Sequence, residues 1–336
     1  MLPLSVYFAI PPGVMLISPY RRVATSFSLS KEWKSYDIFA RQKMSTFRSS
    51  RPAVLELAAR YHELITQMGK KDTRTEAEVD EAEKILFMEM CEICLWGNAT
   101  DLSLLTSLTY EDIQKLQGSE ARKASEKNII VNDLEAAYDV LKKAKKEGKK
   151  ERRVDIVLDN AGFELYVDLI LAGFLLSVGL ATNIILHPKS IPWFVSDVLP
   201  GDFAALLNAL VSPQAFYSTP SEDEKNAGKA PEPLSQTEID ELSFLFREWS
   251  GFYAEGQLLL RPNGFWTEGG SYWRLPTSDP RLHEDLKESQ LVIFKGDLNY
   301  RKLTGDVSFP CLQVRNADIS RQCGILPHHS QRPSVL

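Results

Sequence analysis

The chain has 336 residues, of which 44% are hydrophobic and 25% charged, a composition typical of a globular protein with room for two domains. Its 39 basic and 45 acidic residues give a formal net charge of −6, which provides no general positive field for nucleic acid or an anionic membrane surface. Four scattered cysteines are too few for a disulfide framework, so we expect a reducing location, the cytoplasm with the nucleus as a second compartment.

Residues 1–27 are predicted to be a poorly ordered segment outside the folded domains. Residues 1–17 are largely apolar, but they contain no basic residue before the apolar run, and the proline pair at 11–12 interrupts that run. Such a stretch is shorter than the about 20 residues that a membrane-spanning helix requires. We therefore expect no membrane segment, and no helix within residues 1–26.

Residues 28–125 are predicted to form an all-helical domain, because apolar residues recur there with a helical period. The polar break from Asn98 to Asp101 either caps the following helix or contributes to a ligand site. Cys91 and Cys94 form a CxxC inside an apolar helical run with no histidine at metal-ligand spacing, so we expect them in the core.

Residues 126–309 are predicted to form an α/β domain with a doubly wound, mainly parallel sheet. An apolar run at 163–178, closed by Gly179, is typical of a buried crossover helix between two parallel strands. The predicted strands, rich in β-branched and apolar residues, lie at 127–131, 154–158, 182–186, 258–260 and 291–294. Residues 310–336, with paired histidines and prolines, are predicted to be a disordered tail.

Polar side chains follow three of these strands, and those after the strand at 291–294 lie at 295–301. Asp159 and Asn160 come directly after the first strand of the crossover unit, and Asp197 comes after the second. Because parallel strands end at one edge of a sheet, we expect these side chains to share a crevice. Their oxygens are hard ligands that suit Mg²⁺ or Mn²⁺ and argue against zinc or copper. For Asp159 and Asn160 taken alone, a helix cap is the alternative.

Five longer motifs occur in order along the chain. They are SYDIFARQKMSTFRSS (35–50), CLWGNATDLSLLT (94–106), LDNAGFE (158–164), HPKSIPWFVSDV (187–198) and FKGDLNYRKL (294–303). Together they resemble the damage-control metallophosphatases, and within them the sugar-phosphate phosphatase branch, which includes proteins also described as acidic-residue methyltransferases. The resemblance covers residues 28–309 and neither end of the chain.

The resemblance implies a hydrolase of phosphate monoesters that acts on small sugar phosphates such as fructose 1-phosphate and fructose 6-phosphate. It implies that Asp159, Asn160 and Asp197 are catalytic and bind Mn²⁺, or Mg²⁺, Ni²⁺ or Co²⁺. The substrate contacts that it implies are Asp159, Asn160, Glu164, Asp297, Leu298, Asn299, Tyr300 and Arg301. Arg301 would bind phosphate by its planar fork, and Lys295 would bind phosphate or lie at the surface.

The attacking group is either Asp159 or a water bound to the metal. Phosphatases of the haloacid-dehalogenase type have a second aspartate two residues after the nucleophile, and Ala161 at that position favours water. The first alternative function is S-adenosylmethionine-dependent methylation of acidic side chains, which is claimed for some members of the resembling family. A glycine-rich loop after the first strand would hold that cofactor, and this sequence has none there. The sequence leaves the oligomeric state open.

The second alternative is a non-catalytic family member. The resemblance implies an Arg-Thr-x-Lys motif near the carboxyl terminus, whose lysine contacts phosphate, and residues 311–336 contain no such motif. We therefore expect an altered exon or a shortened isoform with low residual activity and poor solubility.

Overall fold

The computed structural model describes residues 12–68, 75–96 and 129–305, and a four-stranded parallel sheet lies at its centre. The strands are β1 (Arg153–Val157), β2 (Asn183–His187), β3 (Leu258–Leu260) and β4 (Leu291–Phe294), in the order β3-β2-β1-β4. All residues of β1 are buried, as in a parallel sheet covered on both faces. The chain runs outward from β1 to β3 and returns to β4 beside β1, which confirms the predicted doubly wound α/β fold.

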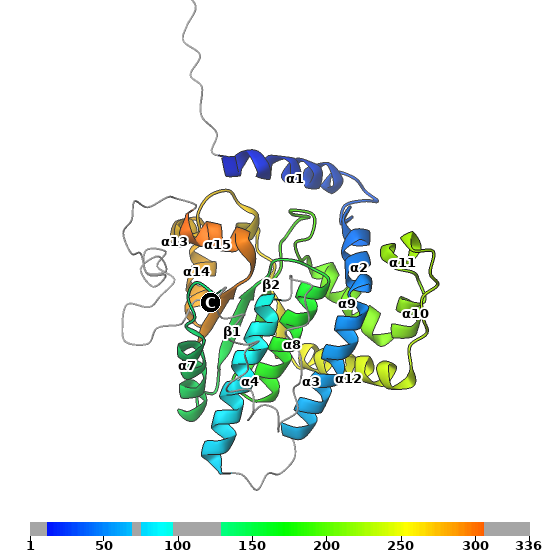
Figure 1. Ribbon diagram of the computed structural model, residues 1–336. Helices are drawn as coiled ribbons and strands as arrows, with labels where there is room; N and C mark the ends of the chain where they lie inside the picture. Colours follow the sequence, from blue (N-terminus) through cyan, green and yellow to red (C-terminus); the bar gives the residue numbers. More distant parts are fainter. Residues whose placement is uncertain (1–11, 69–74, 97–128, 306–336) are drawn as a thin grey trace, which may run out of the picture.

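The helix α8 (Phe163–Ser177) is buried along almost its whole length, and apart from Glu164 and Asp168 its buried residues are mostly apolar because protein layers enclose it. It packs against β2 on one side and against α3 (Arg51–Met68), α4 (Glu76–Trp96) and α12 (Gln236–Ala254) on the others. The amino-terminal helices therefore cover the crossover helix, and the predicted amino-terminal helical region is confirmed (Figure 1).

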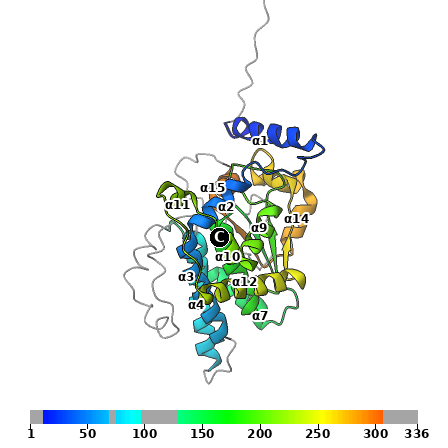
Figure 2. The same ribbon diagram turned by 90° about the vertical axis from the view of Figure 1, so that its right-hand side faces the viewer.

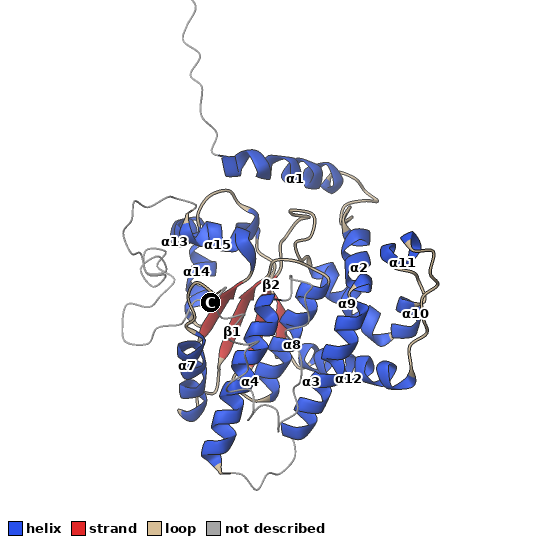
Figure 3. Ribbon diagram, viewed as in Figure 1, coloured by secondary structure: helices blue, strands red, loops and turns tan. Residues whose placement is uncertain are grey.

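The strands lie inside the molecule, and α10 (Pro213–Tyr217) and α11 (Glu222–Asn226) lie at its edge, away from the strands, as Figure 3 shows. The bounds of further helices are α2 (Ala40–Ser49), α7 (Leu134–Lys146), α9 (Pro200–Val211), α13 (Leu275–Ser278), α14 (Pro280–Lys287) and α15 (Gly296–Thr304), with two 3-10 turns, η3 (Gly264–Thr267) and η4 (Tyr272–Arg274). Phe265, Trp266 and Tyr272 are buried in a second, aromatic part of the core beside Val157 of β1. Cys91 and Cys94 are buried free thiols in α4, as predicted.

Two expectations about the path of the chain are wrong. A helix, α1 (Pro12–Ser28), occupies most of the segment in which none was expected, because proline is compatible with the first turn of a helix, where its missing N–H has no partner. Figures 1 and 2 both place α1 across one end of the molecule. The short strand expected at 127–131 is absent from its described part, 129–131. Within the described ranges, no helix is long and apolar enough to cross a membrane.

Candidate active site

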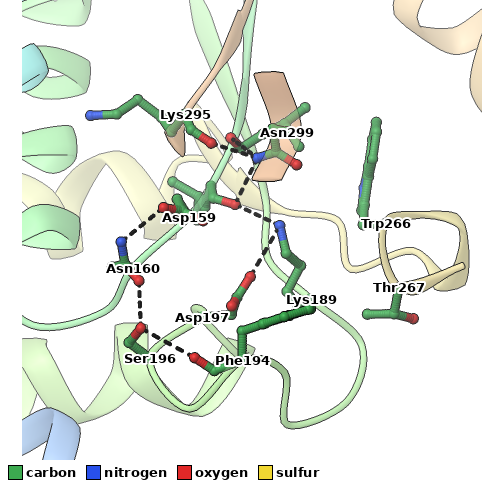
Figure 4. A network of polar contacts seen from close by, with 12 residues as sticks. Asp159, Asn160, Lys189, Phe194, Ser196, Asp197, Trp266, Thr267, Lys295 and Asn299 are labelled. Carbon is green, nitrogen blue, oxygen red and sulfur yellow. Dashed lines mark hydrogen bonds and ion pairs between the residues drawn. The ribbon is translucent and has the colours of Figure 1, made fainter. Parts of the chain in front are cut away.

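Asp159, Asn160 and Asp197 meet beyond the carboxyl ends of β1 and β2 (Figure 4). Asn160 and Asp197 pair as an isolated antiparallel bridge between the two loops. The amide of Val198 also donates to the carbonyl of Asp159 at 2.8 Å. The two loops are therefore joined by their backbones, and this holds the three side chains in one place.

The side chains form a buried acidic cluster. Asn160 Nδ2 donates to Asp159 Oδ2 and to Glu164 Oε2, both at 2.8 Å. Burial raises the pKa of Asp159 to about 7, and the negative charges of Glu164 and Asp197 add to the effect. Burial also raises the pKa of Asp197 to about 6. The cluster thus contains more negative charge than its neighbours compensate, which is the condition that favours a bound cation.

Lys189 lies against this cluster, and sequence reasoning did not single it out. It is fully buried, and its ammonium donates to the carbonyl of Leu158 at 2.9 Å and lies 3.3 Å from Asp197 Oδ1. Its positive charge lowers the pKa of Asp197 against the effect of burial. The signal in the sequence was a lysine within the apolar motif that follows β2.

The oxygen atoms partly fit a divalent metal. Asp197 Oδ1 is buried and, apart from its ion pair with Lys189, accepts no hydrogen bond from the residues that the structure describes. Asn160 Oδ1 accepts a hydrogen bond from Ser196 Oγ at 2.5 Å, and Asn160 Nδ2 faces Asp159. The amide of Asn160 must therefore turn before its oxygen can bind a cation beside Asp159. In the described ranges no three His, Cys, Asp or Glu side chains are grouped to hold a metal. Two carboxylates with one amide oxygen are nevertheless ligands that suit Mg²⁺ or Mn²⁺.

Gly296, at the start of α15, lies directly against Asp159. Its φ is +81°, and a Cβ atom built on it would overlap the Asp159 carboxylate. Two features therefore require glycine at this position: its left-handed backbone conformation and its close approach to the Asp159 carboxylate. The start of α15 becomes one wall of the candidate site.

Asn299 has partners within the protein for both ends of its amide. It is fully buried, and its nitrogen donates to the carbonyl of Lys295 at 2.7 Å and to those of Val157 and Leu158 at 3.3 and 3.4 Å. Its oxygen accepts from the Tyr272 hydroxyl. These contacts hold α15 against the end of β1, so the structure gives Asn299 a supporting role beside the substrate contact that was predicted.

The other predicted residues of α15 are more accessible. Asp297, Tyr300 and Arg301 are exposed and Leu298 is half-buried. Asp297 is close enough to raise the pKa of Asp159, behind the larger effects of burial, Glu164 and Asp197. The substrate contacts predicted for these residues stay predictions.

Lys295 is buried, and its side chain points away from Asp159 and Asp197. Its ammonium donates to the carbonyl of Cys94 at 2.6 Å and to Asp168 Oδ1 at 2.8 Å, and Glu164 Oε1 lies at 3.9 Å. Figure 4 shows the side chain pointing away from Asp159. The buried carboxylate of Asp168 explains this orientation, which sequence spacing could not reveal.

Asn98, Asp101 and residues 310–336 lie outside the described residues.

A strained turn delivers Asp197 to the site. Phe194 and Val195 have positive φ angles of 36° and 67°. Such conformations cost on the order of 1–3 kcal/mol each for residues other than glycine, and they persist where surrounding contacts enforce them. Trp193, before the turn, is fully buried and anchors it on one side.

Lys302 is a second buried lysine near the cluster. Its ammonium donates to the carbonyls of Trp266 and Glu268 at 3.2 and 2.8 Å. Burial lowers its pKa to about 8, and the positive charge of Lys189 lowers it further. Lys302 thereby fixes the η3 turn while it adds positive charge near Asp197.

The helix α2 contacts the loop between β1 and α8. Gly162 has a φ of +74°, and a Cβ there would lie 3.3 Å from the carbonyl oxygen of Lys43. The buried ammonium of Lys43 donates to Asp37 at 2.9 Å and to Asp202 at 2.8 Å. Asp202 in turn accepts from the amide of Leu199 at 2.7 Å. The helical region thus fixes both the loop before α8 and the start of α9.

The chain resembles known proteins over most of its length. The family model described as "Damage-control phosphatase ARMT1-like domain" matches residues 8–329, which extends beyond residues 28–309 at both ends. Proteins named "Damage-control phosphatase ARMT1" are 35% identical over 290 residues in Xenopus laevis and 33% over 290 in Danio rerio, covering 85% of this chain and 58% and 57% of theirs. The Homo sapiens protein is 34% identical over 291 residues, with the same 85% and 58% coverage. The chain therefore spans a little over half the length of these relatives.

Proposed function

Because the chain belongs to the damage-control phosphatase ARMT1-like domain family, we propose that it is a metal-dependent phosphatase that hydrolyses small phosphate monoesters. The observation that carries this proposal is the buried, undercompensated cluster of Asp159, Asn160 and Asp197 at the carboxyl edge of a parallel sheet. Ligands bind at this edge in doubly wound folds.

The three cluster residues would hold the cation, Mn²⁺ or Mg²⁺, with Ni²⁺ and Co²⁺ as further candidates. When bound, the metal supplies positive charge against the phosphate oxygens and lowers the pKa of a coordinated water. Lys189 keeps Asp197 in place and compensates part of the negative charge of the cluster. Arg301, exposed on α15, would bind further phosphate oxygens through its guanidinium fork.

The proposed substrates are short ketose phosphates such as fructose 1-phosphate and fructose 6-phosphate. Asp297 is exposed in the first turn of α15 beside Gly296, where a carboxylate can accept hydrogen bonds from sugar hydroxyls. Methyl transfer is not proposed, since β1 leads through Asp159, Asn160 and Ala161 into α8 with one glycine, Gly162, in place of a glycine-rich loop.

Phosphate release from a panel of sugar phosphates and nucleotides, measured with malachite green with Mn²⁺ or with EDTA, tests this function. We expect Mn²⁺-dependent release that favours sugar phosphates and falls at least about a hundredfold in Asp159→Ala, which removes a proposed metal ligand. Asp139→Ala, which removes an exposed carboxylate on α7, is the matched control. Equal release from nucleotides would refute sugar selectivity, and an active Asp159→Ala variant would refute the site.

A further inference from the structure

The helix α1 crosses the end of the molecule at which the strands finish. Figures 1 and 2 place it across that end, separate from the helices that cover the sheet. Its contacts reach two different loops, the strained turn at 193–195 and the η3 turn. These loops follow β2 and β3, and both lie beside the candidate site (Figure 4).

Tyr20 contacts the strained turn. Its ring centroid lies 5.0 Å from that of Phe194 and 5.9 Å from that of Trp193. Phe39, just before α2, packs on the same tyrosine at 6.3 Å. An aromatic cluster from three parts of the chain thus encloses a backbone conformation that needs support from outside.

Arg21, the next residue, contacts the second loop. Its guanidinium donates twice to the carbonyl of Thr267, from Nε at 3.2 Å and from a terminal nitrogen at 2.7 Å. The neighbouring carbonyls of Trp266 and Glu268 accept from Lys302. Three successive carbonyls of this turn therefore depend on two cations, one of them supplied by α1.

We propose that Tyr20 and Arg21 are positioning residues, which hold the two loops beside the site and thereby set the placement of Asp197. The inference rests on the proposed metal site and extends it to a helix that contains none of the three proposed ligands Asp159, Asn160 and Asp197. Tyr20 acts through the turn at Phe194, which precedes Asp197 by three residues and is joined to it through the chain. Arg21 acts on the opposite loop, whose Thr267 hydroxyl lies 3.4 Å from that of Ser190, after β2.

Two matched pairs of variants in the full chain test this. Tyr20→Ala is compared with Phe27→Ala, since Phe27 is a half-buried aromatic residue of the same helix that packs on Tyr36. Arg21→Ala is compared with Arg22→Ala, which removes the neighbouring exposed cation. The readouts are Mn²⁺ affinity by electron paramagnetic resonance, melting temperature in EDTA, and metal-free hydrogen exchange of peptides covering 193–198.

We expect Tyr20→Ala to weaken Mn²⁺ binding about three- to tenfold and Arg21→Ala about two- to fivefold, as the loss of one aromatic or hydrogen-bonded contact implies. Exchange at 193–198 should rise in Tyr20→Ala, and Tyr20→Phe should restore both properties. The Phe27 and Arg22 variants should leave Mn²⁺ affinity and this exchange unchanged, whatever their melting temperatures.

Equal effects of the Tyr20 and Phe27 variants on Mn²⁺ affinity would overturn the proposal, and so would unchanged exchange in Tyr20→Ala. A parent chain that binds no Mn²⁺ would refute the metal site itself. Exchange at 193–198 would then still decide whether Tyr20 holds the turn, because that measurement needs no metal.

Discussion

At the scale of single residues, Gly296 decides how close α15 can approach the acidic cluster. In Gly296→Ala the new methyl group would overlap the Asp159 carboxylate, so either the carboxylate or the start of α15 must move. We expect Mn²⁺ binding to fall at least tenfold and the free energy of unfolding to fall by about 2–4 kcal/mol, from overpacking and backbone strain together. Titration calorimetry and urea unfolding measure the two quantities.

Gly256→Ala is the control for this variant. Gly256 has a similar φ of +73°, but a Cβ there meets nothing within 4 Å. The Gly256→Ala variant should lose about 1 kcal/mol of unfolding free energy, from backbone strain alone, with Mn²⁺ binding unchanged. Equal Mn²⁺ binding in the two variants would contradict the contact between Gly296 and Asp159.

Asp159 is predicted to reduce the stability of the metal-free chain. Its pKa is raised from 3.8 to about 7, so the folded state holds a proton that the unfolded state releases, and stability must fall as the pH rises from about 4 to 7. Asp159→Asn should therefore stabilise the chain in EDTA by on the order of 2 kcal/mol at pH 7.5 and by little at pH 4. Differential scanning fluorimetry at both pH values measures this.

With Mn²⁺ present, the parent should become more stable than Asp159→Asn. The parent gains stability by mass action, about 2.7 kcal/mol at a metal concentration a hundred times the Kd, and Asp159→Asn does not. An Asp159→Asn variant that is less stable than its parent in EDTA at pH 7.5 would contradict the excess negative charge of the cluster.

At the scale of elements, Lys295, directly after β4, forms a buried ion pair with Asp168 of α8 and a hydrogen bond with the carbonyl of Cys94 in α4. Asp168 is fully buried, and Lys295 is its cation. Lys295→Met should destabilise the fold by about 3–5 kcal/mol, because it leaves a buried charge without its partner. Adding Asp168→Leu should recover most of this loss, since an apolar pair needs no compensation. Urea unfolding of the single and double variants measures the difference, and a double variant no more stable than Lys295→Met would contradict the pairing.

Some elements of this fold can be recognised from sequence patterns and others cannot. Continuous apolar runs mark the unit β1-α8-β2 because its residues are buried on all sides, and its strands lie within one residue of the predicted bounds. The helix α1 was missed because its prolines resemble a break, although the first lies in a position that tolerates it.

The candidate site was predictable to the extent that its residues follow strand ends. Asp159, Asn160 and Asp197 could be grouped because parallel strands finish at one edge. The orientation of Lys295 depends on Asp168, 127 residues away, and the burial of Lys189 depends in part on the carbonyl of Leu158, 31 residues away. No local pattern contains these partners. Asn299 likewise supports β1 through carbonyls that become its neighbours only after folding.

At the scale of the whole molecule, a charged network spans the sheet away from the candidate site. Arg153 of β1 donates to Asp155 within the same strand and to Asp285 of α14, with distances from 2.6 to 2.9 Å. His187 Nε2, at the end of β2, lies 2.6 Å from Asp155 Oδ1. Arg261, which follows β3, also donates to Asp285 at 2.9 Å. All four strands lie close to this network, so its charge state should affect global unfolding.

Asp285 gives this network a definite pH dependence. The hydrogen bond from Arg153 lowers its pKa from 3.8 to about 2, so its contribution is complete above the unfolded pKa and is lost as the pH falls towards 2. The side chain is 36% exposed, and after discounting for solvent screening we expect Asp285→Asn to destabilise the chain by about 1 kcal/mol at pH 7 and by about half of that at pH 3. Urea unfolding at pH 7, 4.5 and 3 measures the trend, and Glu284→Gln, a change in the more exposed neighbouring carboxylate, should show a smaller effect. A difference between Asp285→Asn and the parent that stays constant over this pH range would assign the effect to packing or neutral hydrogen bonds, and would contradict a role for the charge of Asp285.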